Sequence, residues 1–172
     1  MIRSAAAAIL LILFSLVITG QPPRKLPVKQ PTRHSNGLPP EIMTHLDKNY
    51  PGWEFLTSTS ACEKKFHLPV IPGFFNKDNV EDFIIKIQYK KKGLVLGYMS
   101  SSEGYKFIES FIRNSATAVQ NTSFAVDRAG KQIITEKQLR YRLENDALIT
   151  WSCSNPRQYT YWVYRDGTFN VL

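Results

Sequence analysis

The side chains that most often carry out catalysis are few in this chain and do not lie close together in sequence. Its three histidines, His34, His45 and His67, have none of the spacings that metal sites use. The sequence holds no GxSxG motif, no glycine-rich phosphate loop and no Ser-Lys motif. The sequence does not exclude a catalytic triad whose members are distant from one another in the chain. We therefore favour a protein that is not an enzyme, and we expect no cofactor.

The segment from Tyr159 to Phe169 is rich in tyrosine and tryptophan, which are enriched in recognition surfaces. Alternation along a strand places Tyr161 on one face and Trp162 with Tyr164 on the other. We predict that Trp162 and Tyr164 form a binding surface that is partly open to solvent. The alternative is that one aromatic face packs in the core while the other lies on the surface of a sheet.

A second candidate binding site is the run Lys90-Lys91-Lys92 at the tip of a predicted hairpin. Lys91 and Lys92 could bind an anionic glycan or a lipid head group, but lysines in such a place are commonly just solvated. We expect Trp162 to contribute more to binding than either lysine, because a docked aromatic side chain loses little conformational entropy.

Residues 73–83 read Gly-Phe-Phe-Asn-Lys-Asp-Asn-Val-Glu-Asp-Phe. This segment resembles the Gly-Asp-Phe-Asn-Gly-Asp-Gly-x-x-Asp-Tyr segment of FG-GAP or VCBS-type sequences, in which carboxylates at alternate positions can hold calcium. It is also similar to a segment of small exported bacterial domains of unknown function. Those domains share the Tyr-Pro-Gly-Trp of residues 50–53 and an aromatic hairpin with Asp-Gly, as at residues 159–169. The resemblance implies an exported location and a related fold more than an activity.

The residues that match the calcium-binding positions of that pattern are Asn76, Asp78 and Asp82. The segment departs from the pattern at the first carboxylate and at both inner glycines, where it has Phe74, Lys77 and Asn79. Calcium takes about six to eight oxygen ligands, and its loop needs a glycine for the sharp bend. We expect no bound metal but a structured turn, in which Asn76 and Asp78 bond neighbouring backbone amides.

The first 20 residues have the order of a secretory signal peptide: a basic residue at Arg3, an apolar run over residues 5–18, and small residues at Thr19 and Gly20. Residues 21–37 follow as a proline-rich, basic tether. We expect an exported protein, either periplasmic or secreted. An uncleaved leader that anchors the chain in a membrane is the alternative, and leader and tether are the only expected membrane contacts.

The remaining residues, 38–172, are predicted to form a single α+β domain: an antiparallel sheet of hairpins with one to three short helices packed on one face. Hairpins are predicted at residues 82–99 and 159–172, with turns at Lys91-Lys92-Gly93 and Asp166-Gly167. Further strands are expected at residues 53–60, 123–127 and 131–135.

Two helices are expected in this domain. The first begins at Pro40 and carries an apolar stripe of Ile42, Leu46 and Tyr50. The second is predicted from the capping-box spacing of Ser100 and Glu103. It would run through Arg113, with Ile108, Phe111 and Ile112 as its buried stripe.

Together these patterns favour an exported, non-catalytic binding domain whose partner is a protein or a component of the cell envelope. Nucleic acid is not expected, because the domain is only mildly basic and contains no known nucleic-acid-binding motif. An inhibitor or immunity-type protein that blocks a partner enzyme is the first alternative, and it should offer a projecting loop or hairpin. A hydrolase of envelope polymers is the second.

The two cysteines, Cys62 and Cys153, are predicted to form a disulfide, because an oxidising compartment favours pairing of the only two thiols. They are 91 residues apart in sequence, so the crosslink should stabilise the fold by about 4 to 5 kcal/mol. Thiol titration of the denatured exported protein should find no free thiol without reductant. Two free thiols would contradict the prediction, and Cys153→Ser should lower stability to that of the reduced protein.

Overall fold

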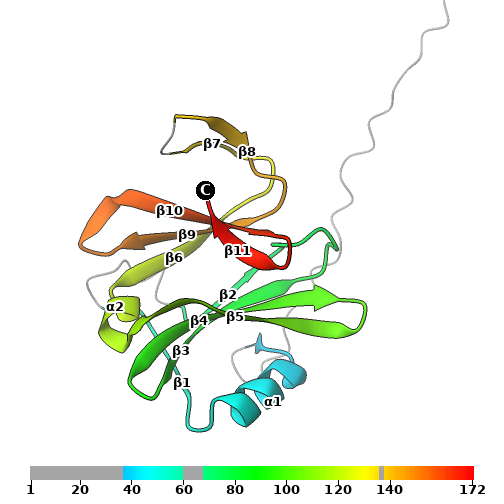
Figure 1. Cartoon of the computed structure of the whole chain (residues 1–172), viewed down its shortest axis with the longest axis vertical. Helices are drawn as coiled ribbons and strands as arrows, with labels where there is room; N and C mark the ends of the chain where they lie inside the picture. The colour runs from blue at the N-terminus through cyan, green and yellow to red at the C-terminus, as the bar shows by residue number, and fades with distance from the viewer. Residues whose placement is uncertain (1–36, 60–67, 136–137) are drawn as a thin grey trace, which may run out of the picture. The chain divides into compact units, whose positions relative to one another are not determined.

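The computed structural model describes residues 37–59, 68–135 and 138–172. The expected leader, nearly all of the expected tether and Cys62 lie outside these residues. Within them the chain forms two helices and eleven strands (Figure 1). The helices are α1 (Pro40–Asn49) and α2 (Ala116–Gln120). The strands are β1 (Glu54–Phe55), β2 (Val70–Gly73), β3 (Asp82–Tyr89), β4 (Lys92–Ser101), β5 (Gly104–Ser115), β6 (Thr122–Asp127), β7 (Gln132–Ile134), β8 (Arg140–Arg142), β9 (Ala147–Ser152), β10 (Asn155–Arg165) and β11 (Thr168–Val171).

The first sheet is antiparallel and has the order β1-β3-β4-β5, with β2 also paired to β3. β1 and β2 lie one after the other along the same edge of β3, because Phe55 pairs with Ile87 and Val70 pairs with Ile85. The backbone of Lys86 lies between them. Its carbonyl accepts from the N–H of Leu56 at 3.0 Å, and its N–H donates to the carbonyl of Pro69 at 2.8 Å.

The predicted hairpin at residues 82–99 is confirmed as β3 and β4, but its turn lies one residue earlier than expected. Tyr89 pairs with Lys92, so Lys90 and Lys91 form a two-residue turn, in which both have positive φ, 47° and 65°. Gly93 belongs to β4, where a Cβ would lie 2.6 Å from the side chain of Val119. The glycine therefore serves the close approach of α2 to the sheet and not the turn.

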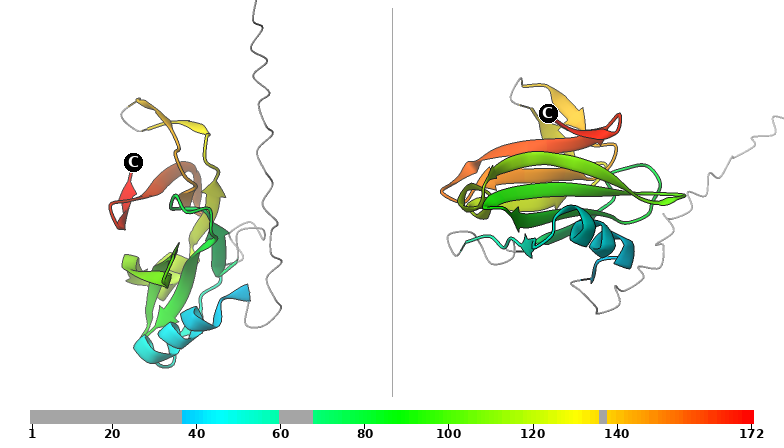
Figure 2. Two further views of the ribbon diagram at one scale, coloured as in Figure 1. Left: turned by 90° about the vertical axis from the view of Figure 1, so that its right-hand side faces the viewer. Right: turned by 60° about the horizontal axis from the view of Figure 1, so that its bottom comes forward.

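α1 covers one face of the first sheet with the apolar stripe that the sequence predicts (Figure 2). Ile42 and Leu46 are buried in a cluster that includes Ile85 and Leu96 of the sheet. The helix begins at Pro40, where the missing proline N–H would have no helical partner. In the described part of the chain, no helix is long and apolar enough to cross a membrane.

The second sheet has the order β11-β10-β9-β6 and packs against the other face of the first. Ile84 and Met99 of the first sheet share one buried cluster with Phe124 and Leu148 of the second. The described chain is thus layered as helix, sheet and sheet. The predicted C-terminal hairpin is confirmed as β10 and β11, joined by Asp166-Gly167 with both residues at positive φ.

The predicted α+β fold class is wrong, because most of the described chain is antiparallel β-sheet and residues 104–115 form strand β5 where a helix was expected. The apolar residues of this segment are spaced as on a helix because β5 contains an irregularity. The register shifts between the pairs Val95–Ile112 and Gly97–Ile108, which breaks the usual alternation. Ser101 and Gly104 form the turn that separates β5 from β4, with the Ser101 hydroxyl donating to the Gly104 carbonyl at 2.7 Å.

One charged side chain, Lys86, is built into the core between the two sheets. It is fully buried, and its Nζ donates to Ser58 Oγ at 2.9 Å and lies 4.7 Å from the centre of the Phe124 ring. No carboxylate in the described part of the chain forms an ion pair with it. Burial therefore lowers the pKa of Lys86 from 10.5 to about 8.

This lowered pKa links the stability of the protein to pH. Between about pH 8 and pH 10.5 the folded state releases the Lys86 proton while the unfolded state keeps it. The contribution of Lys86 to the free energy of unfolding should therefore increase as pH rises through this range. Lys86→Met should stabilise the protein below pH 8, because it removes a buried charge and keeps the length of the side chain.

Chemical unfolding of both proteins across this pH range checks the prediction. The free energy of unfolding of Lys86→Met should exceed that of the wild type by less as pH rises. The control Lys92→Met, which replaces an exposed lysine, should show no such trend. A pH-independent difference between wild type and Lys86→Met would contradict it.

Candidate functional site

The loop from Phe74 to Glu81 is held by two buried carboxylates. Asp82 accepts from the N–H groups of Phe75 at 2.7 Å and Asn76 at 3.1 Å. Asp146, which precedes β9, accepts from the N–H of Phe74 at 3.0 Å, and its own N–H donates to the Phe74 carbonyl. Three consecutive amides of the loop are thus fixed by carboxylates that belong to the two different sheets.

Asp82 also binds the end of β4. Its Oδ1 accepts from both the N–H and the hydroxyl of Ser100, each at 2.7 Å. Burial raises the pKa of Asp82, and the hydrogen bonds from Ser100, Asn76 and Phe75 act in the opposite direction.

Asn76 and Asp78 form the turn that the sequence predicts. Asn76 Oδ1 accepts from the N–H of Asp78 at 3.0 Å, and Asp78 Oδ1 accepts from the N–H of Val80 at 2.9 Å. The side chain of Lys77 leaves this turn and forms an ion pair with Glu144 at 3.1 Å. In the ranges that the structure describes, no group of three or more His, Cys, Asp or Glu residues is placed to hold a metal ion.

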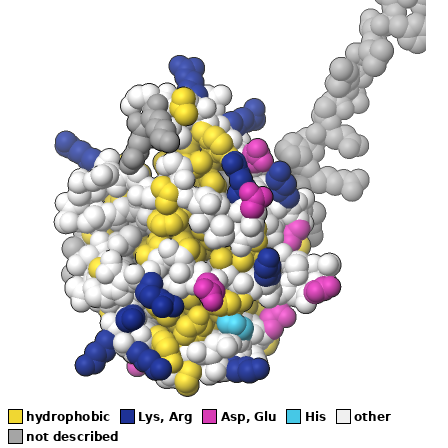
Figure 3. Space-filling model, in the orientation of Figure 1, with side chains coloured by type: hydrophobic (Ala, Val, Ile, Leu, Met, Phe, Trp, Pro, Cys, Tyr) yellow, Lys and Arg dark blue, Asp and Glu magenta, His cyan; other side chains and the backbone are white. Residues whose placement is uncertain are grey.

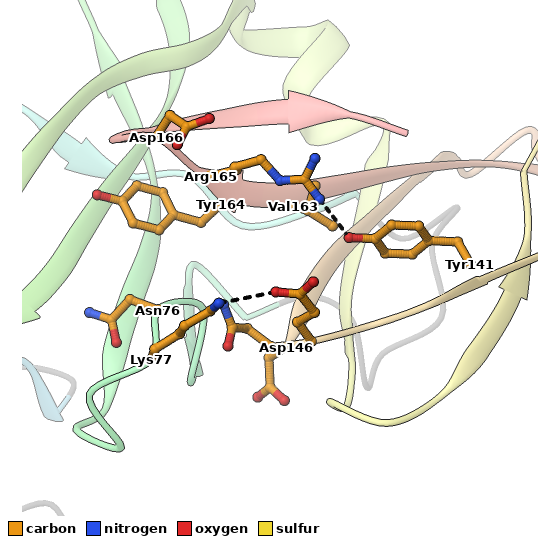
Figure 4. Close-up of a pocket in the computed structure, with 10 residues that line it drawn as sticks. Asn76, Lys77, Tyr141, Asp146, Val163, Tyr164, Arg165 and Asp166 are labelled. Atoms are coloured by element: carbon orange, nitrogen blue, oxygen red, sulfur yellow. Dashed lines mark hydrogen bonds and ion pairs between the residues drawn. The ribbon is translucent and has the colours of Figure 1, made fainter.

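An open pocket of about 270 Å³ lies beside this loop (Figure 4). Its wall is formed by Asn76 and Lys77 of the loop, by Tyr141 of β8, by residues 144–146, and by residues 163–166 at the end of β10. A wider, more open groove of about 770 Å³ shares Asn76, Lys77 and residues 144–145 with it.

Four of the charged side chains that line the pocket, those of Lys77, Glu144, Asp146 and Arg165, are held by hydrogen bonds or ion pairs. Arg165 Nη2 donates to the hydroxyl of Tyr141 at 2.8 Å, and Lys77 is paired with Glu144. Asp146 is almost fully buried and is bound by the Arg128 guanidinium at 2.6 Å in addition to backbone amides. Its oxygens therefore hold the scaffold together, and the pocket wall contains both cations, Lys77 and Arg165, and carboxylates.

Of the predicted binding residues, Tyr164 lines this pocket and Trp162 does not. The Trp162 ring lies 5.6 Å from that of Phe111, and its Nε1 donates to Thr150 Oγ1 at 2.9 Å. Trp162 and Tyr164 are half-buried and face the core between the sheets. The face that was expected to be the more open one is thus turned toward the first sheet. Tyr161, on the other face, packs in a smaller cluster with Ile133 and Leu143.

The structure does not bring the lysine tip to the pocket. Lys91 and Lys92 are exposed where β3 meets β4. The loop that supplies Asn76 and Lys77 lies at the opposite end of these strands, where Asp82 and Ser100 meet. Cys62 lies outside the described residues, so the disulfide stays a prediction. Cys153 Sγ lies 3.2 Å from Ser123 Oγ.

Sequence reasoning missed three residues of the pocket. The sequence marks Lys77 only as a departure from the calcium-binding pattern, and it marks Arg165 and Tyr141 as neither binding nor catalytic residues. No local pattern marks them, because they come from three separate segments that only the packing of the two sheets brings together. The number of aromatic residues near Tyr164 was the one useful signal.

No family model matches this chain, and no curated protein and no solved structure is significantly similar to it. The resemblance to FG-GAP or VCBS-type sequences therefore stays a hypothesis.

The role of Asp82 can be tested by Asp82→Asn, which replaces one acceptor oxygen by an NH₂ group facing backbone donors. We expect a loss of about 2 to 4 kcal/mol in the free energy of unfolding, because buried N–H groups lose their partners. Asp166→Asn is the matched control, since Asp166 is exposed and its side chain accepts no hydrogen bond in the described part of the chain, and it should cost less than about 1 kcal/mol. Urea unfolding measures both, and equal losses would contradict the assignment.

Proposed function

We propose that this chain is an exported, non-catalytic binding domain that holds a polar, hydroxyl-rich ligand, such as an envelope saccharide, in the pocket beside Tyr164. The observation that carries the proposal is a half-buried tyrosine in the wall of an open pocket, where cations and carboxylates are both present. The leader sequence supports the exported location.

The balance of charge in the pocket favours a neutral polar ligand. A strongly anionic ligand would meet Glu144 and Asp166, and a strongly cationic one would meet Lys77 and Arg165. Hydroxyl groups both donate and accept, so they can bond to groups of either kind. The Tyr164 hydroxyl is protonated at neutral pH and can donate a hydrogen bond, and burial raises its pKa further.

The existing contacts also prepare the pocket for binding. Arg165 is already oriented by Tyr141, and Lys77 is already oriented by Glu144. Side chains held in place before the ligand arrives lose less conformational entropy on binding. The same contacts support a non-catalytic role, because Asp146 and Glu144 are engaged with Arg128 and Lys77.

An inhibitor-type protein is the second candidate, and one observation favours it. Among the described strands, β7 and β8 pair only with each other, and their hairpin projects from the second sheet, where Ile133 packs in one cluster with Tyr161 (Figure 1). Such a projecting hairpin is what a protein that blocks a partner's cleft would offer.

Saccharide fragments of the envelope polymers, titrated into the labelled protein and followed by NMR, test the pocket. Shifts should cluster at Tyr164, Arg165 and Asn76. Tyr164→Phe keeps the ring against Phe169 and removes one hydroxyl, so it should weaken binding by about 3- to 10-fold.

The matched control is Tyr159→Phe, an exposed tyrosine on the same strand and outside the pocket, which should bind as the wild type does. Equal affinity of Tyr164→Phe and wild type, or shifts away from these residues, would contradict the proposal. Recovery of cleaved fragments would show that the protein is an enzyme.

A further inference from the structure

The β7–β8 hairpin, with the residues that lead into it, forms an arm. We define the arm as residues 128–135 and 138–142. It is a two-stranded sheet of its own, and both Figure 1 and Figure 2 show it projecting from the two large sheets. Its inner face is anchored, because Ile133 is buried with Leu143 and Ala147 and is joined there by Tyr141.

The outer face of the arm is apolar and basic. Cross-strand pairing places Ile134 opposite Arg140 and Gln132 opposite Arg142. Ile134 is 65% exposed, and Leu139, next to the turn, is 62% exposed. Two aliphatic side chains are therefore open to solvent at the end of a narrow projection, beside two arginines.

The net positive charge of the domain is concentrated in the arm. By sequence, residues 128–142 contain five basic residues and one acidic residue, a net charge of +4, whereas residues 38–172 as a whole carry 17 basic and 14 acidic residues, a net charge of +3. Lys131 and Arg128 are paired with Asp127 and Asp146 at its base. In the described part of the chain, Arg140 and Arg142 form no ion pair. Figure 3 shows basic side chains standing out beside apolar surface at this end of the molecule.

We propose that the arm docks on an anionic phospholipid surface, with Ile134 and Leu139 entering the interface and Arg140 and Arg142 contacting the head groups. Charge complementarity favours an anionic partner. The exposed aliphatic residues favour a lipid over a soluble polyanion, which has no apolar phase to receive them. A cleft in a protein is less favoured, because the exposed apolar residues of the arm, Ile134 and Leu139, are aliphatic, and its outer face lacks the tryptophan or tyrosine that anchors protein interfaces.

Such docking is weak and sensitive to salt, because it uses two aliphatic side chains and two cations. Tyr141 belongs to both the arm and the wall of the pocket, but docking uses the outer face of the arm and requires no ligand in the pocket, so the two proposals can fail separately. Because the expected leader and tether can also contact a membrane, the test must report on the arm itself.

Hydrogen–deuterium exchange of the full chain provides that local measurement. Vesicles of phosphatidylcholine with phosphatidylglycerol should slow amide exchange in residues 132–135 and 138–142, and vesicles of phosphatidylcholine alone should not. Unchanged exchange of the arm while the chain is bound to anionic vesicles would overturn the proposal, as would a failure to bind them.

Two variants separate the apolar part of the interaction from the charged part. The first double variant is Ile134→Ser with Leu139→Ser, and the second is Arg140→Gln with Arg142→Gln. Each should lower the protection of the arm against exchange and should reduce the part of vesicle binding that depends on the arm by about tenfold. The matched controls are Val171→Ser, an exposed aliphatic residue outside the arm, and Lys91→Gln with Lys92→Gln. Both controls should leave arm protection unchanged.

Heparin tests for a soluble polyanion. If heparin protects the arm as well as anionic vesicles do, and the Ile134 and Leu139 variants are protected equally, the ligand is a polyanion and the proposal is wrong. If the control variants lowered arm protection as much as the arm variants do, the proposal would also be wrong. The effect would then reflect total charge and not the arm.

Discussion

Two buried carboxylates hold three consecutive backbone amides, and this arrangement connects the two sheets of the protein. The N–H of Phe74 donates to Asp146, and those of Phe75 and Asn76 donate to Asp82. Asp82 begins β3 of the first sheet, while Asp146 immediately precedes β9 of the second. Hydrogen bonds to ionised acceptors are stronger than neutral ones, and leaving these buried groups unpaired is costly. The loop between them therefore has little freedom to move.

The pocket and the arm both depend on this connection. The loop supplies Asn76 and Lys77 to the pocket. Asp146 also binds Arg128 and the N–H of Ala129, which lie where the arm leaves the second sheet. The carboxylate that fixes the pocket wall thus fixes the base of the arm as well. Lys86 differs from these two carboxylates, because its charge is buried without an oppositely charged partner in the described residues. This buried charge lowers the stability of the core that surrounds it.

The aromatic C-terminal hairpin also acquires its role from its neighbours. Alternation correctly separates Trp162 and Tyr164 from Tyr161, but it cannot say which face is covered. The first sheet covers one face through Phe111, and Ile133 and Leu143 cover part of the other. What remains open around Tyr164 is a pocket and not a flat surface, so recognition here would use a few polar contacts around one ring.

Elements whose signals are local can be predicted from the amino-acid sequence. Helix α1 follows from Pro40 and the Ile42–Leu46 stripe, the turn at Asn76 and Asp78 from their short polar side chains, and the last hairpin from Asp166-Gly167. These depend on residues close together in the chain, so their physical causes can be read from it. That residues 104–115 form a strand could not be predicted in this way, because an irregular pairing with β4 gives the segment helix-like spacing of its apolar residues. The pocket could not be predicted either, since Lys77, Tyr141 and Arg165 meet only when the two sheets pack together.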